Sequence, residues 1–222
     1  MSTTRIERPQ PPVIYPDSDG EPMAESETQW EWLALLKHGL QTIFEPRRHE
    51  VFVGSDQFWY PVQGDPTIRT APDVMVVFGR PRDPLRRSWL QWEENDLPPA
   101  VVIEVRSHTN SDETLDARRE FGERYGVSEF WIIDPEPDAV DPVLSWHRMD
   151  DRLVARDADD WHSPLLGITF QQVGRELIVV GPAGERLLSY HEQRERAEDQ
   201  ARRADALARK LRSLGIDPDT VA

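Results

Sequence analysis

Residues 100–107 have the sequence Ala-Val-Val-Ile-Glu-Val-Arg-Ser, an apolar run that contains a single carboxylate, Glu104. A short run of β-branched residues predicts a strand that is buried on both faces of a sheet. An ionised carboxylate within such a strand is costly unless something cationic meets it. The run therefore predicts both a central strand and a charged site on that strand.

A second apolar run, residues 71–77, has the sequence Ala-Pro-Asp-Val-Met-Val-Val and carries Asp73. Two carboxylates, a backbone carbonyl and water molecules suit a hard divalent cation such as Mg²⁺ or Mn²⁺. Such a cation activates water and stabilises charge that develops on a phosphate. We predict a metal site made by Asp73, Glu104 and the carbonyl of Val105, and we consider Glu31, on the first predicted helix, as a further acid.

Two arginines are candidates for stabilising a phosphate beside this site. Alternation along the strand places Arg106 on the same face as Glu104. In the helix that follows, Arg118 falls within the stripe formed by Leu115 and Gly122, so we expect it to face the sheet. The alternative is that Pro-Asp forms an ordinary turn and that Glu104 is part of a buried ion pair retained for fold specificity.

The pattern around these runs predicts an α/β fold, with a mixed central β-sheet flanked by helices. Ser26, with Gln29 three residues later, resembles a capping box and begins a helix that extends to Ile43. Asn110 or Ser111 caps a second helix, closed by Gly126, and strand, helix and strand at this spacing predict a βαβ crossover. We also expect a hairpin from residues 51–53 and 58–60, and strands at 130–133, 143–147, 152–155 and 177–180.

The chain is expected to have three parts. Residues 1–22 are proline-rich and predict an extended arm, residues 23–186 the α/β domain, and residues 187–222 a C-terminal helix and tail. Some apolar residues of the tail repeat at heptad spacing, but Gln193 and Gln200 occupy positions where a coiled coil prefers leucine. A helix folded back on its own domain and the seam of a homodimer therefore both remain open.

Composition restricts the classes of function. The net charge of −15 over 222 residues disfavours a general nucleic-acid coat, because phosphate binding depends on lysine and arginine. The chain contains no cysteine and no long apolar stretch, so we expect a cytoplasmic protein with no membrane contact. The six histidines lack metal-ligand spacing, although His108 follows the Glu104 strand closely enough to reach a phosphate.

The connection between the two carboxylate strands is rich in arginine. It is either a solvated loop with a short helix or a basic edge that binds nucleic acid. The residues concerned are Arg80, Arg82, Arg86 and Arg87.

Four segments together resemble, in order and spacing, the Uma family of putative restriction endonucleases. The resemblance implies a PD-(D/E)XK nuclease-like fold and magnesium-dependent cleavage of phosphodiester bonds, with DNA as the expected substrate. It also implies that Asp73 and Glu104 are the acids of the site. The segments are residues 59–62, 71–77, 98–107 and 126–135.

The departure from the family pattern concerns a lysine that commonly lies on the helix after the glutamate strand. Arg118 occupies that helix position here, and no lysine occurs between Lys37 and Lys210. Arginine neutralises a phosphate, but its pKa is too high for it to act as a general base. We therefore consider two hypotheses, an endonuclease in which arginine replaces lysine and a catalytically degenerate nuclease fold that acts as a binding or oligomerising module.

Overall fold

The computed structural model describes residues 13–18, 20, 26–108, 110–157, 161–215 and 217. Its centre is a six-stranded sheet with the order β1-β3-β5-β6-β7-β8, in which only the pair β5–β6 is parallel. This confirms the predicted mixed sheet. The strands are β1 (Val51–Ser55), β3 (Val74–Phe78), β5 (Val101–Val105), β6 (Glu129–Ile133), β7 (Val143–Met149) and β8 (Arg152–Ala155).

Helix α2 (Asp112–Tyr125) connects β5 to β6 and completes the predicted βαβ crossover. Ser111 is the N-cap, since its side chain accepts a hydrogen bond from the backbone N–H of Thr114. Gly126 ends the helix in the left-handed region, with φ of 102°. Gly122 lets the helix approach the sheet, because a Cβ there would lie 3.2 Å from Val127 and 3.3 Å from Phe130.

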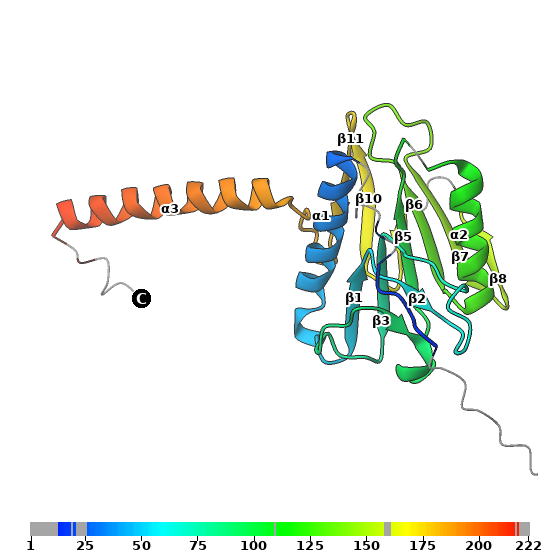
Figure 1. The fold of residues 1–222 in the computed structure, drawn as a ribbon. Helices are drawn as coiled ribbons and strands as arrows, with labels where there is room; N and C mark the ends of the chain where they lie inside the picture. The colour runs from blue at the N-terminus through cyan, green and yellow to red at the C-terminus, as the bar shows by residue number, and fades with distance from the viewer. Residues whose placement is uncertain are drawn as a thin grey trace, which may run out of the picture.

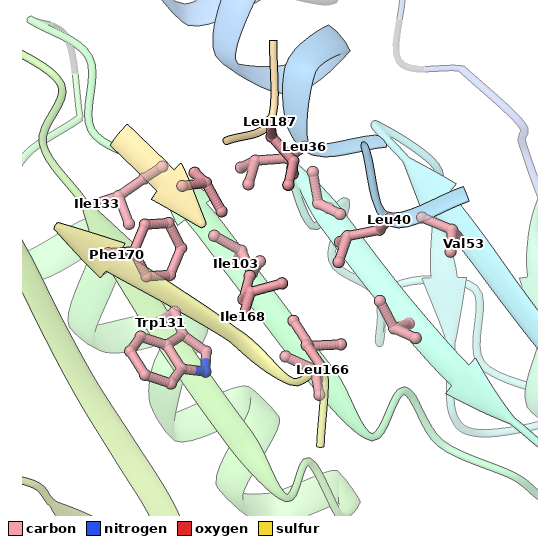
Figure 2. Close-up of a cluster of buried hydrophobic side chains, with 14 of the residues drawn as sticks. Leu36, Leu40, Val53, Ile103, Trp131, Ile133, Leu166, Ile168, Phe170 and Leu187 are labelled. Atoms are coloured by element: carbon pink, nitrogen blue, oxygen red, sulfur yellow. The ribbon is translucent and has the colours of Figure 1, made fainter. Parts of the chain in front are cut away.

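The two faces of the sheet are covered differently. Helix α1 (Glu27–Ile43) lies over one face with a small three-stranded sheet, and α2 lies over the other (Figure 1). Leu36 and Leu40 of α1 belong to the same buried cluster as Ile103 of β5 and Phe170 of the small sheet (Figure 2). The small sheet has the order β11-β10-β9 and consists of β9 (His162–Ser163), β10 (Ile168–Val173) and β11 (Glu176–Val180).

The predicted hairpin of residues 51–53 and 58–60 is wrong. Strand β1 pairs with β3, whereas β2 (Trp59–Tyr60) pairs in parallel with β4 (Trp89–Leu90). Asp56, with φ of 47°, turns the chain, and its N–H donates to the carbonyls of Pro72 and Asp73. The turn that follows β1 is therefore bonded to the segment leading into β3, and not to residues 58–60. Two short 3₁₀ helices complete the domain, η1 (Glu45–Arg47) and η2 (Gln91–Glu93).

The chain ends in a long helix, α3 (Tyr190–Ser213), which extends away from the α/β body (Figure 1). Ser189 and Glu192 form a capping box at its start, and none of its residues is buried. Among the described helices, none combines the length and the apolar character needed to cross a membrane. Most of the predicted N-terminal arm, and Pro218 beyond α3, lie outside the described residues.

Candidate functional site

The two carboxylates predicted to share a site lie on neighbouring strands. In the antiparallel register of β3 and β5, Val74 lies opposite Ile103, so the next pair outward is Asp73 and Glu104. Cross-strand partners present their side chains on the same face of a sheet. The backbone fixes both groups, because the N–H of Val105 donates to Oδ2 of Asp73 at 2.7 Å and the N–H of Asp73 donates to the Glu104 carboxylate.

One arginine meets this pair. Nη1 of Arg118 lies 2.5 Å from Oε2 of Glu104, so the helix residue faces the sheet as its spacing predicts. The side chain of Glu104 is 1% exposed and that of Arg118 is 29% exposed, so the guanidinium is the part that solvent reaches. Arg106 instead contacts Asp112 at 2.6 Å and Asp134 at 3.6 Å. Of the two candidate arginines, Arg118 is the one whose ion pair is with Glu104.

A glutamine that sequence reasoning assigned to helix capping also belongs to the site. Gln29 is buried, and its side chain hydrogen-bonds to Asp73. Its backbone N–H donates to the Ser26 hydroxyl at 3.1 Å, as the capping prediction requires, but its side chain is directed to Asp73. Glu31 is exposed and lines a different groove, beside Trp32. The sequence offers no signal for Gln29 beyond its spacing from Ser26.

Burial opposes ionisation of both acids. It raises the pKa of Asp73 to about 6 and that of Glu104 to about 8, and for Glu104 the nearby Asp73 carboxylate adds to the effect. Arg118 acts in the opposite direction on both groups. Two carboxylates face one guanidinium, so the site carries an excess negative charge when both acids are ionised.

This donor set fits a hard divalent cation. The ligands that Asp73 and Glu104 offer are all oxygens, which Mg²⁺ and Mn²⁺ prefer. Within the described part of the chain, no group of three or more His, Asp or Glu side chains is arranged to hold a metal ion. Magnesium usually keeps several water ligands and needs only one or two carboxylates. Asp73 and Glu104 therefore provide the number and type of side chains that such an ion requires.

The raised pKa values predict that the metal-free protein loses stability as pH rises. Glu104 ionises near pH 4.5 in the unfolded chain and near pH 8 in the folded one, so unfolding is favoured progressively between these values. In EDTA, Glu104→Gln is expected to match the wild-type melting temperature at pH 5 and to exceed it by about 5 °C at pH 8. Glu136→Gln removes an acid that is half exposed and controls for the change in net charge. Equal melting curves for wild type and Glu104→Gln at pH 8 would contradict this prediction.

Two arginines of the predicted basic edge share one carboxylate. Arg80 and Arg86 both lie 2.5 Å from Glu94. Arg86 is 8% exposed, and its guanidinium lies 4.8 Å from the ring centre of Phe52 and 5.0 Å from that of Trp89. Arg86 therefore serves the packing of the domain.

The remaining residues that were predicted to bind nucleic acid also lie beside acidic side chains. Arg82 contacts Glu45 at 3.0 Å, and Arg87 contacts Asp17 at 2.7 Å. His108 is largely exposed, with Nε2 at 3.8 Å from Glu136. Each of the four arginines of this edge thus contacts an acid of the same chain, and its binding of nucleic acid stays a prediction.

Comparison with known proteins places the chain in a family. Residues 4–156, more than half of the chain, match the model of Uma2, described as "Putative restriction endonuclease". The chain belongs to the Uma2 family. The matched segment includes Asp73, Glu104 and Arg118, and membership of the Uma2 family supports nuclease activity in general terms.

Among solved structures, the chain is similar to a putative nuclease belonging to DUF820 from Anabaena variabilis ATCC 29413. The two are 15% identical, with a TM-score of 0.42 over 63% of this chain and 72% of the other. No curated protein matches the chain.

Proposed function

We propose that this Uma2 protein is a metal-dependent endonuclease that hydrolyses phosphodiester bonds of DNA. Asp73 and Glu104 would hold Mg²⁺ or Mn²⁺, with the carbonyl of Val105 as a further ligand. The observation that carries the proposal is the pairing of two buried carboxylates with one arginine, which leaves a negative charge for a cation to balance when both acids are ionised. Perturbed acids brought together in this way mark functional sites more often than ordinary surface acids.

The residues around the metal ligands would each have a separate role. A bound divalent cation supplies the positive charge that polarises water and stabilises the phosphate. Gln29 and the Val105 N–H orient Asp73, and the Asp73 N–H orients Glu104. Arg118 holds Glu104, and the geometry of its five N–H donors allows the same guanidinium to bind a phosphate oxygen as well.

Because Arg118 does not lose its proton, it cannot accept a proton from the attacking water. Hydrolysis adds a water oxygen to phosphorus and breaks one P–O ester bond, and the leaving oxygen gains a proton. Arg118 stays protonated throughout, so the proton that water loses must pass to an acceptor other than this side chain. Arg118 would therefore stabilise charge in the transition state without acting as a base.

A metal and substrate assay tests the proposal directly. Supercoiled plasmid DNA is incubated with the full chain in Mg²⁺, Mn²⁺ or EDTA, with single-stranded RNA as a parallel substrate. Nicking or linearisation in Mg²⁺ or Mn²⁺ and none in EDTA is expected, together with a rise in melting temperature on adding Mn²⁺. Cleavage of the RNA alone would contradict the assignment of DNA.

Arg118→Ala separates the arginine from the metal ligands. Loss of a group that stabilises transition-state charge is expected to slow cleavage about 100-fold, while Mn²⁺ still raises the melting temperature. Arg124→Ala, which removes an exposed arginine from the last turn of the same helix, is the matched control and should cleave normally.

The alternative function, a binding or oligomerising module, is favoured by one observation, the replacement of lysine by Arg118. It predicts that Mn²⁺ leaves the melting temperature unchanged and that no condition gives cleavage.

A further inference from the structure

Helix α3 contributes no residue to the proposed nuclease site. It has 24 residues, which corresponds to a length of about 36 Å, and it projects from the body into solvent (Figure 1). Leu207 is 63% exposed and Leu214 is 66% exposed. In proteins most helical stability comes from packing of an apolar face, and within the described part of the chain no residue of α3 is buried by such packing.

The leucines of α3 and of its C-cap lie at the two inner positions of a heptad, a and d. Leucines concentrate in the last third of the helix, while alanines and glutamines fill the earlier turns. Positions a are Tyr190, Ala197, Ala204 and Leu211, and positions d are Gln193, Gln200, Leu207 and Leu214. This spacing is the one that coiled coils use, and the polar d positions make this seam a weak one.

The residues that flank the seam determine which orientation two such helices favour. One flank, position g, is basic throughout, with Arg196, Arg203 and Lys210. The other flank, position e, has Ala201 and Ala208 in its second and third heptads. In the described part of the chain, none of the three basic residues has an ion-pair partner.

An antiparallel pair brings the g flanks of the two helices together, so the three basic residues of one chain would face those of the other. In a parallel pair each g flank faces the e flank of its partner, so Arg196 and Arg203 would lie beside Ala201 and Ala208. Like charges are thereby kept apart, and the aliphatic stems of the arginines can cover the small alanines. A parallel pair also stacks the leucines of both chains on one another.

We propose that α3 is a homodimerisation helix, which forms a parallel two-stranded coiled coil with α3 of a second copy of this chain. The proposal does not rest on nuclease activity. A parallel arrangement places both α/β domains at the same end of the coiled coil, so that their carboxylate pairs lie on the same side of the assembly.

The oligomeric state of the full chain is the first test. Sedimentation velocity over a range of micromolar concentrations is expected to show a species of twice the 25.7-kDa chain mass that dissociates on dilution. Leu207→Glu/Leu211→Glu places charges in the seam and should give a monomer at every concentration. Ala206→Glu/Ser213→Glu adds the same two charges outside the seam and should leave the dimer intact.

Single cysteines test the orientation, because the natural chain contains none. In a parallel pair each seam residue meets its own copy, so Gln200→Cys alone and Ala204→Cys alone should each form a disulfide-linked dimer under mild oxidation. In a fully overlapped antiparallel pair Gln200 meets Ala204 of the other chain, and only a mixture of the two variants would cross-link.

Three results would overturn the proposal. They are a monomer at every concentration, a dimer that survives Leu207→Glu/Leu211→Glu, and cross-linking that requires the mixture. Circular dichroism of each variant should show that the α/β domain is intact, since the substituted residues lie on a helix with no buried residue.

Discussion

Asp73→Asn is expected to abolish metal-dependent cleavage and to remove the effect of Mn²⁺ on the melting temperature. Asparagine has nearly the shape of aspartate and retains a carbonyl oxygen that can accept the 2.7 Å hydrogen bond from Val105. The negative charge is lost, however, and with it the strongest attraction that this side chain offers to a divalent cation. A fall of about 1,000-fold in cleavage rate is expected, because both the orientation of water and the stabilisation of phosphate charge depend on the ion.

Asp73→Asn should preserve or raise the thermal stability of the metal-free chain although it abolishes cleavage. Burial raises the pKa of Asp73, so its ionised form is disfavoured in the folded chain, and a neutral amide avoids this cost. In EDTA at pH 8, Asp73→Asn should therefore melt at or above the wild-type temperature. Asp116→Asn makes the same chemical change on the exposed surface of α2 and should alter neither property. Cleavage by Asp73→Asn at the wild-type rate would exclude Asp73 from the site.

The core of this site follows from local sequence patterns. An apolar run that contains Glu104, a capped helix and a second apolar run predict β5, α2 and β6, and helical spacing alone directs Arg118 toward the sheet. Each of these features depends on residues close together in the chain, where periodicity is informative. Local patterns do not show which strands pair. The proximity of Asp73 and Glu104 therefore also depends on the antiparallel pairing of β3 with β5.

Contacts between distant parts of the chain were not predictable in the same way. Gln29 and Asp73 lie on different elements, and nothing local distinguishes a capping glutamine from one that contacts a carboxylate. Arg82 and Glu45 are similarly far apart, so a basic edge inferred from composition carried no information about its acidic partners. Strands β4, β9 and β10 were not predicted, because β4 and β9 have only two residues each and all three acquire their structure from the strands with which they pair.

Glu129 is, within the described residues, a third buried carboxylate. It lies at the start of β6 and is 3% exposed. Its oxygens accept hydrogen bonds from the Ser163 hydroxyl at 2.5 Å, the Leu165 N–H at 3.0 Å and the Trp131 indole N–H at 3.2 Å. These donors come from the large sheet, from β9 and from the segment between β9 and β10, so one carboxylate connects the two sheets.

Glu129→Ala is expected to destabilise the domain by about 3–5 kcal/mol, because it leaves several buried donors without an acceptor and opens a cavity. For a chain of this size the melting temperature should fall by about 10 °C or more. Glu120→Ala, on the exposed side of α2, is the control and should shift it by less than about 2 °C. Thermal unfolding followed by circular dichroism measures both, and a small shift for Glu129→Ala would contradict the structural role.

Glu129 and the Asp73–Glu104 pair can be distinguished by how their substitution changes stability. Glu129 is surrounded by neutral donors that satisfy it, so its removal should cost stability. Burial disfavours the ionised forms of Asp73 and Glu104, and the Asp73 carboxylate adds to this effect on Glu104, so neutralising either acid should preserve or raise stability in the absence of metal. If the variants behave in these opposite ways, the carboxylate pair is retained for a purpose other than folding, as a metal-dependent nuclease site requires.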